Sequence, residues 1–189
     1  MELKVENLTK HYGGKTVLDG VSFALRAGVT CLMAPSGAGK TTLLRLLLGL
    51  EKADGGQITG LAGRRISAVF QEDRLLPGLD AAGNLRFVLG ADCDEGRAAE
   101  LLGELGLSDV GDKAVRDYSG GMRRRLALAR ALLFPCDILL LDEPFTGLDP
   151  ENRRRAAACV RRHGAGKIVF IVTHEASDAE ALEAEILRL

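Results

Sequence analysis

Residues Ala34–Thr41 read APSGAGKT and decide the fold, because they match the pattern GxxxxGK[ST] at every position except the first glycine. A short apolar run, Val29–Ala34, precedes them, and Lys40–Leu50, apolar nearly all round, follows. This order predicts a strand, a glycine-rich loop and a buried helix. Backbone N–H groups in such a loop point inward toward phosphate oxygens, as does the positive end of the helix. The stretch therefore predicts a phosphate-binding loop in an α/β protein.

The side chains of this loop suit a nucleoside triphosphate. Lys40 is placed to reach the β- and γ-phosphates, and the Thr41 hydroxyl can ligate Mg²⁺. Ala34 departs from the pattern, but a residue before proline is pushed to an extended backbone that alanine adopts without strain. The alternative is a chance glycine-rich turn between a strand and a helix. The predicted nucleotide-binding residues of this loop are Ser36, Gly37, Ala38, Gly39, Lys40, Thr41 and Thr42.

A second motif combines a buried strand with an acidic end. Four apolar residues, Ile138–Leu141, run directly into Asp142, Glu143 and Pro144. In phosphate-loop enzymes an Asp at the end of such a strand completes the Mg²⁺ environment. Glu143 is next in sequence and is the natural group to orient or deprotonate an attacking water. Standing alone, these acids would be an ordinary solvated strand end; the phosphate loop favours the catalytic interpretation.

Composition excludes several classes of protein. Of 189 residues, 47% are hydrophobic and 27% are charged, which indicates a globular chain rather than a disordered one. The formal net charge of −1 gives no overall field that attracts nucleic acid or an anionic membrane. Aromatic residues make up only 4% of the chain, too few for a nucleic-acid groove built on base stacking. No nucleic-acid partner is therefore predicted.

The four cysteines, Cys31, Cys93, Cys136 and Cys159, lie far apart and form no CxxC pair. They are predicted to be small buried hydrophobes in a reducing compartment, with a structural zinc site as the alternative. The N-terminus does not resemble a signal peptide, and no apolar run approaches the roughly 18–20 residues of a membrane span.

The hydrophobic pattern indicates strands at both ends of the chain and helices between them. Alternation predicts strands over Glu2–Leu8 and Val17–Leu25, with the turn at Gly13–Gly14. The expected fold is three-layered α/β: one domain of residues 1–189, with a core of about 1–71 and 135–189 and a helical insert of about 72–134. Helical periodicity is expected over Ala81–Leu89, Glu95–Leu107, Gly120–Leu133, Glu151–His163 and Glu175–Leu182.

Arginines gather on the predicted helices, at Arg123–Arg125, Arg153–Arg155 and Arg161–Arg162. The simplest interpretation is that they form solvated helix faces. His11 and His163 have no chemical context and are predicted to have no catalytic role.

A third motif, Tyr118-Ser119-Gly120-Gly121-Met122, opens the helix that precedes the acidic strand. It resembles the LSGGQ signature of ATP-binding cassette (ABC) ATPases. Met122 stands where that signature has glutamine and cannot donate an amide hydrogen bond, and Tyr118 stands in place of leucine. Because the Ser-Gly-Gly centre is kept, weaker signature contacts are expected rather than loss of hydrolysis.

Other elements lie in the order that the family shows. Tyr12 resembles the aromatic residue that stacks on adenine, Gln71 the Q-loop glutamine, Gly147–Asp149 the D-loop and His174 the H-loop histidine. The resemblance covers almost the whole chain. It implies a phosphate-loop NTPase core, with a mixed sheet and an antiparallel N-terminal β region, that binds ATP and Mg²⁺.

The resemblance also implies a site shared by two cassettes paired head to tail. Each ATP would lie between one phosphate loop and the partner's signature, with contacts from Ser119, Gly120, Gly121 and Asp149. Catalysis would use Glu143, His174 and Gln71, and Mg²⁺ would be held by Thr41, Gln71 and Asp142.

The resemblance favours an ATPase subunit that energises a membrane transporter. Because the chain is a single cassette with no spanning helix, the translocation path is expected to lie in a permease on another polypeptide. The stretch Phe70–Pro77 resembles importer ATPases of the nitrate, sulfonate and taurine group. Expected partners are the permease, a second cassette and a solute-binding protein, and the expected location is the cytoplasm, on the inner face of the cell membrane. A non-transport ABC ATPase and an ATP-binding regulatory cassette are the alternatives, while Ser119–Gly121 argues against a small-molecule kinase.

Overall fold

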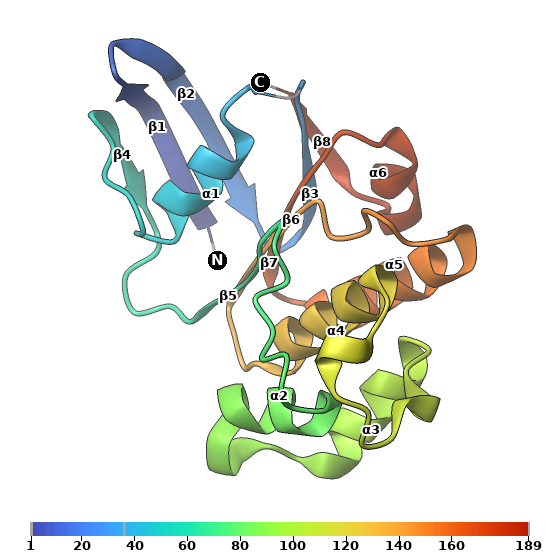
Figure 1. Cartoon of the computed structure of the whole chain (residues 1–189). Coiled ribbons are helices and arrows are strands. Elements are labelled where there is room, and N and C mark those ends of the chain that lie inside the picture. Colours follow the sequence, from blue (N-terminus) through green and yellow to red (C-terminus); the bar gives the residue numbers. More distant parts are fainter. Residues whose placement is uncertain (1, 36, 189) are drawn as a thin grey trace.

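The computed structural model describes residues 2–35 and 37–188, which fold around two β-sheets (Figure 1). Ser36, one of the predicted nucleotide-binding residues, lies outside the described residues. The strands are β1 (Glu2–Tyr12), β2 (Lys15–Arg26), β3 (Gly28–Met33), β4 (Gly55–Thr59), β5 (Ile66–Val69), β6 (Ile138–Asp142), β7 (Ile168–Thr173) and β8 (Glu185–Arg188). The α-helices are α1 (Lys40–Leu47), α2 (Ala81–Leu89), α3 (Glu95–Glu104), α4 (Gly120–Leu133), α5 (Pro150–Gly164) and α6 (Ala176–Leu182). Short 3₁₀ turns lie at Gly90–Asp92, Ser108–Val110 and Val115–Asp117.

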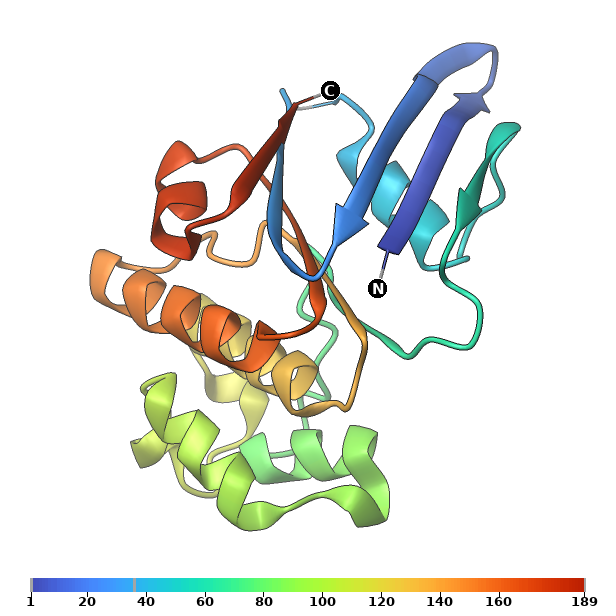
Figure 2. The same ribbon diagram turned by 180° about the vertical axis from the view of Figure 1, so that it is seen from behind.

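The two sheets differ in strand direction. The order β2-β1-β4 is antiparallel throughout, and the hairpin turns at Gly13–Gly14 as the alternation predicts. The order β5-β6-β7-β3-β8 is parallel throughout, with β8 next to β3 near the C-terminus (Figure 2). Because parallel strands end at one edge, the loops after β3, β5, β6 and β7 lie along the same side of the sheet.

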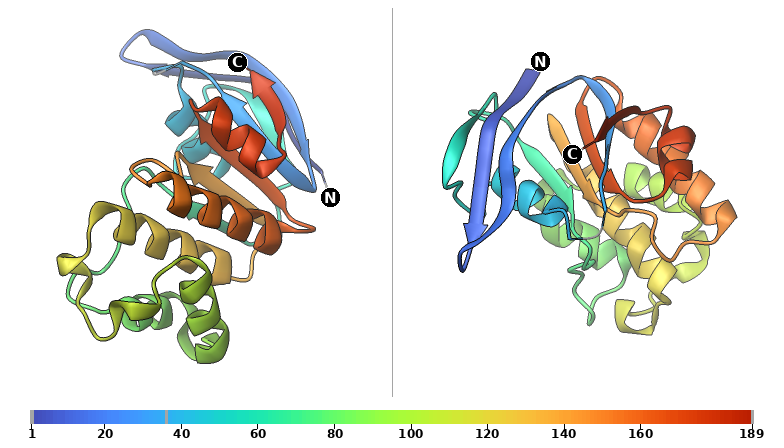
Figure 3. Two further views of the ribbon diagram at one scale, coloured as in Figure 1. Left: turned by 90° about the vertical axis from the view of Figure 1, so that its right-hand side faces the viewer. Right: turned by 90° about the horizontal axis from the view of Figure 1, so that it is seen from above.

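Alternation along the central strands creates two hydrophobic cores. On β7, Ile168, Phe170 and Val172 pack toward α1 and the antiparallel sheet, whereas Val169 and Ile171 pack toward α4, α5 and α6. All six residues of β7 are buried, as expected for a parallel strand covered on both faces. From above, the antiparallel sheet, α1, the parallel sheet and the covering helices follow one another (Figure 3).

Glycines with positive φ end two helices earlier than the periodicity predicts. The helix expected over Lys40–Leu50 ends at Leu47, with Gly49 at φ +67° beyond it. The helix expected over Glu95–Leu107 ends at Glu104, with Gly106 at φ +68°. A left-handed glycine just past the last turn accepts a conformation that other residues rarely adopt, so the helix stops there.

The segment 72–134 carries α2 and α3, which lie at the end of the molecule remote from the antiparallel sheet (Figure 1). Its last helix, α4, packs against β5, where the Ser67 hydroxyl donates to the Ala131 carbonyl at 3.0 Å. Residues of α2, α3 and α4 share one hydrophobic cluster with the parallel sheet. The division into a core and a helical insert stays a prediction.

The cysteines are free thiols, and Cys31, Cys136 and Cys159 are buried as predicted. The prediction is wrong for Cys93, which is only partly buried because it follows the short 3₁₀ turn Gly90–Asp92 between α2 and α3. Burial raises the pKa of Cys31 and of Cys159 to about 12, so both thiols stay protonated. Within residues 2–35 and 37–188, no cluster of metal-ligating side chains forms, and no helix has the length and apolarity to cross a membrane.

Candidate functional site

The phosphate loop joins β3 to α1, and glycine is required at its end. Gly39 has φ +82° and precedes the first residue of α1. A Cβ atom there would lie 2.8 Å from the Val17 carbonyl oxygen, so any larger residue would clash with β2. Gly37, also at φ +82°, is exposed. The backbone therefore turns sharply and leaves the N-terminus of α1 facing the loop.

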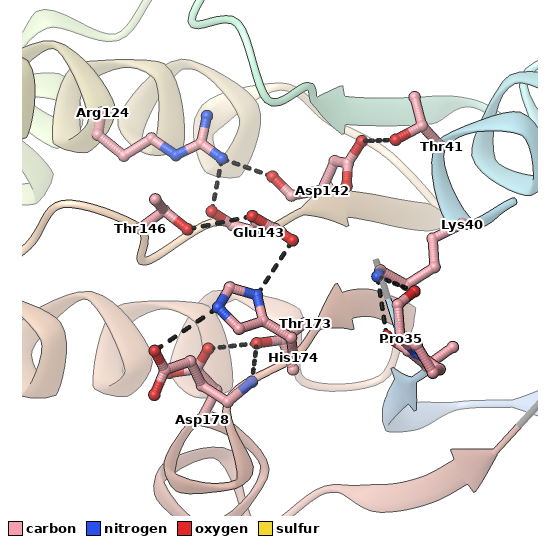
Figure 4. Close-up of polar contacts among 12 residues, drawn as sticks. Pro35, Lys40, Thr41, Arg124, Asp142, Glu143, Thr146, Thr173, His174 and Asp178 are labelled. Atoms are coloured by element: carbon pink, nitrogen blue, oxygen red, sulfur yellow. Dashed lines mark hydrogen bonds and ion pairs between the residues drawn. The ribbon is translucent and has the colours of Figure 1, made fainter. Parts of the chain in front are cut away.

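Lys40 is the buried cation of this loop. Its Nζ donates to the carbonyl oxygens of Ala34 at 2.8 Å and Pro35 at 2.9 Å (Figure 4). These carbonyls hold the ammonium group against the start of the loop. Lys40 as a whole residue is 8% exposed. A bound phosphate would offer it charged oxygen acceptors, which make stronger hydrogen bonds than carbonyls do.

Asp142 lies at the end of β6 and meets the phosphate loop. Its Oδ2 accepts a hydrogen bond from the Thr41 hydroxyl at 2.9 Å, although the two residues are 101 positions apart in sequence. Burial raises the pKa of Asp142, and the charge of Glu143 adds to the rise while the Thr41 hydrogen bond opposes it. A buried carboxylate beside a hydroxyl provides hard oxygen ligands of the kind that Mg²⁺ prefers.

Glu143 follows at once and faces the histidine at the end of β7. Its Oε1 lies 3.1 Å from Nδ1 of His174, and its Oε2 lies 3.5 Å from the Thr146 hydroxyl (Figure 4). The backbone of Glu143 has φ +46°, and its N–H donates to the Val172 carbonyl at 2.8 Å. A non-glycine residue in this left-handed conformation is strained, by roughly 1–3 kcal/mol, and such strain clusters at functional sites.

Hydrogen bonds and an ion pair with α5 and α6 hold the turn that carries His174. The Thr173 hydroxyl donates to Asp178 at 2.6 Å and accepts from the Glu175 N–H at 3.1 Å. Arg153 of α5 pairs with Asp178 at 3.3 Å. Burial raises the pKa of Asp178, with the Thr173 hydrogen bond acting against the rise. The His174 ring itself is largely exposed and free to meet a ligand.

A pocket of about 290 Å³ lies between the phosphate loop and the acidic end of β6. Among the described residues, its lining does not include Tyr12, Ser119–Gly121, Asp149 or His174. It is lined by Val17, Gly37, Gly39, Lys40, Thr41, Thr42, Gln71, Asp142 and Glu143. The structure thus brings the predicted phosphate loop, Gln71 (predicted to be the Q-loop glutamine) and the acidic strand end together.

The predicted signature lies at the N-terminus of α4, where Ser119 and Gly120 are exposed. Ser119 caps this helix, and its hydroxyl oxygen accepts from the Met122 N–H at 3.2 Å. A Cβ atom on Gly121 would lie 3.5 Å from the Gly147 carbonyl oxygen, so the signature packs beside the predicted D-loop. Asp149 caps α5 in the same way, and hydrogen bonds centred on Asn152 lower the pKa of its carboxyl.

Tyr12 ends β1 beside the hairpin turn. Its ring is 44% exposed, its hydroxyl donates to Glu51, and the Lys10 ammonium lies 5.3 Å from the ring centre. The ring is therefore accessible for stacking on a planar base.

Two arginines of the run 123–125 contradict the sequence interpretation, which placed them on a solvated face. Arg124 and Arg125 are 4% and 8% exposed. Arg125 donates to the carbonyls of Leu105 and Gly106, and Arg124 donates to loops on both sides of the pocket. The missed signal is positional: both lie four residues before residues of the buried face, Leu128 and Ala129.

Residues 18–146 match the protein family described as ABC transporter. The chain belongs to this family. The match confirms the predicted family and fold class and the class of activity, ATP binding and hydrolysis.

Named relatives of this ABC ATPase cover almost its entire length. It is 42% identical over 194 residues to the aliphatic sulfonates import ATP-binding protein SsuB 2 of Paraburkholderia xenovorans, covering 99% of this chain and 76% of that protein. It is 38% identical over 206 residues to the probable sulfate/thiosulfate import ATP-binding protein CysA of Chlorella vulgaris, covering 100% and 87%. It is 41% identical over 201 residues to the Nod factor export ATP-binding protein I of Ralstonia nicotianae, covering 97% of this chain but only 63% of that protein.

Proposed function

We propose that this chain is the ATP-hydrolysing subunit that energises solute import through a separate membrane permease. Relatives named for sulfonate and sulfate import support this direction. The relative named for Nod factor export makes export the second candidate. On either interpretation the chain acts from the cytoplasm at the inner face of the membrane, and import would also involve a solute-binding protein.

The observation that carries the proposal is the convergence of Lys40, Thr41, Asp142 and Glu143 on one pocket. In the proposed roles, Lys40 and the α1 N-terminus bind the β- and γ-phosphates. Thr41 and Asp142, joined at 2.9 Å, would hold Mg²⁺ with Gln71 nearby, and the ion would neutralise charge on the phosphates. Glu143 would accept the proton of the attacking water, and His174 would orient that carboxylate.

We assign Ser119, Gly120, Gly121 and Asp149 to a second nucleotide. Ser119, Gly120 and Gly121 form a helix N-terminus outside the pocket, with Ser119 and Gly120 exposed, so it is free to meet ATP bound by a partner cassette. Asp149 would act at the same interface by holding the loop beside the signature. Tyr12 lies near α1 of its own chain, through Glu51 and Arg45, and would stack on the adenine of the nucleotide that this chain's phosphate loop binds. One chain therefore supplies two different halves of a shared site.

Mixing two inactive variants tests this arrangement. Lys40→Ala removes the phosphate contact of one half, and Ser119→Arg blocks the other, so each variant alone should be nearly inactive. A mixed dimer rebuilds one site from the intact phosphate loop of one chain and the intact signature of the other. Recovery of ATP hydrolysis on mixing is expected, and absence of recovery although heterodimers form would refute the shared site.

Transport direction requires the membrane partner. The chain, co-expressed with its permease in vesicles that expose the cassette outside, should drive ATP-dependent loss of a preloaded substrate if the system imports. ATP-dependent accumulation in the same vesicles would establish export and overturn the import proposal.

A further inference from the structure

Arg124 connects α4 to both loops that border the phosphate pocket. Its side chain is 5% exposed, and its charge meets the Asp73 carboxylate at 3.1 Å. All three nitrogens of the guanidinium find acceptors, at 2.5–3.3 Å. The acceptors are the carbonyl oxygens of Phe70, Gln71, Asp142, Glu143 and Pro144 and the carboxylate of Asp73.

These bonds divide between two functional segments. One terminal nitrogen donates to the main-chain oxygens of Phe70 and Gln71. The other donates to those of Asp142 and, at 2.6 Å, Glu143 (Figure 4). A planar guanidinium offers donors in fixed directions, so it sets the spacing of the two loops as well as their separate positions. The single charge of a lysine could not reproduce that geometry.

The hydrogen bond from Arg124 to the Glu143 carbonyl is made to a residue with a strained backbone. Glu143 has φ +46°, a conformation that persists only where its surroundings hold it. Its N–H donates to the Val172 carbonyl at 2.8 Å, and its own carbonyl accepts from Arg124 at 2.6 Å and, at a longer 3.2 Å, from the Thr146 N–H. Without Arg124, the peptide after Glu143 would lose its only charged hydrogen-bond partner among the described contacts and could relax toward an ordinary conformation.

We propose that Arg124 is a positioning residue for hydrolysis, which holds the Glu143 carboxylate and the Q-loop in their working geometry from the signature helix. This inference rests on the proposed function, because it assumes that Glu143 activates water. Among the described residues, Arg124 donates hydrogen bonds to main-chain oxygens and to the Asp73 carboxylate, so it acts through other residues. Displacing a catalytic group by about 1 Å can lower the rate about 100-fold.

The test compares kcat and ATP affinity in Arg124→Gln. We expect kcat to fall about 10- to 100-fold while the Kd for ATP changes less than about threefold, because the phosphate loop is untouched. Arg124→Lys should recover part of the loss. In a Glu143→Gln background the same change should lower the residual rate less than about threefold, since the group it positions is already absent.

Arg130→Gln is the matched control. Arg130 lies on the same helix and donates to Asp73 at 2.9 Å and Arg74 at 2.7 Å, but not to the 142–144 segment. Its loss should lower the melting temperature with little effect on kcat.

Wild-type kcat in folded Arg124→Gln, or an equal loss of kcat in Arg130→Gln, overturns the inference. If Arg124→Gln does not fold, wild-type kcat in Arg124→Lys overturns it instead. Failure of the wild-type chain itself to hydrolyse ATP would instead overturn the proposed function.

Discussion

Substitution of Glu143 by glutamine should separate chemistry from structure at this site. The backbone of residue 143 is anchored through main-chain groups, with its N–H on Val172 at 2.8 Å and its carbonyl on Arg124 at 2.6 Å. A glutamine has nearly the same shape and leaves both anchors in place. It also keeps an oxygen for the Thr146 hydroxyl at 3.5 Å. We therefore expect little change in stability or in ATP binding.

The expected loss lies in the hydrolysis step. Glutamine cannot accept the proton of the attacking water, and removal of a general base lowers rates by about 10²- to 10⁴-fold. This range corresponds to about 2.7–5.4 kcal/mol of transition-state stabilisation. Phosphate release in a single turnover at saturating ATP and Mg²⁺ measures the chemical step, and equilibrium binding of a fluorescent ATP analogue measures affinity. The analogue's Kd should stay within about threefold of wild type, a difference below about 0.7 kcal/mol.

Glu175→Gln provides a control on the other side of the same histidine. Glu175 Oε1 lies 3.7 Å from Nε2 of His174, so this change removes one negative charge beside the ring without touching residue 143. Its effect on phosphate release should stay within about threefold, because an exposed charge pair contributes little. Near-normal phosphate release in Glu143→Gln, or an equal loss in Glu175→Gln, would refute the assignment of the base to Glu143.

Three further changes probe the surrounding structure. Lys40→Ala should weaken ATP binding about 10- to 100-fold in an equilibrium titration, the value of a charged hydrogen bond. The raised pKa of buried Asp142 means that the folded state binds more protons, so its contribution to stability falls as pH rises from 3.8 through the folded pKa. Asp142→Asn should therefore gain unfolding free energy relative to wild type, and the gain should grow as the pH rises above about 4; a constant difference would contradict this. Among the described residues, no hydrogen bond of good geometry reaches the buried Tyr118 hydroxyl, whose one polar neighbour of this kind is a weak contact with the Ala81 N–H. Tyr118→Phe should therefore gain about 1 kcal/mol and melt about 3 °C higher.

The phosphate loop and the acidic strand end could be predicted from the sequence, because the residues within each motif determine its local backbone structure. Gly39 must be glycine for the turn into α1, and four apolar residues before Asp142 favour the covered strand that the structure shows there. Both predictions depend on neighbours in sequence. The pairing of Thr41 with Asp142 spans 101 residues, and it becomes predictable only because parallel strands end at one edge of the sheet.

Residue type alone does not predict which arginines are buried. Arg123, Arg124 and Arg125 are identical as side chains, and charge alone favours a solvated face for all three. Their burial differs because different parts of the fold pack against each side chain. Arg124 faces main-chain carbonyl oxygens in the two loops that follow β5 and β6. Because these oxygens accept hydrogen bonds from its guanidinium group, they compensate the cost of burying its charge. Such acceptors come from residues far away in sequence, so only the folded chain reveals them.

Assembly of two cassettes should depend on nucleotide, for an electrostatic reason visible in one chain. The α1 N-terminus borders the phosphate pocket, whereas the α4 N-terminus at Ser119 is exposed and lies outside it. Each helix end carries about half a positive charge, so two facing ends repel unless an anion lies between them. The Glu143→Gln chain should therefore sediment as a monomer without ATP and as a dimer with ATP, since the triphosphate persists. ADP should not replace ATP, because it lacks the γ-phosphate that joins the two ends. A stable dimer without nucleotide would show that other surface contacts, rather than ATP, hold the two chains together.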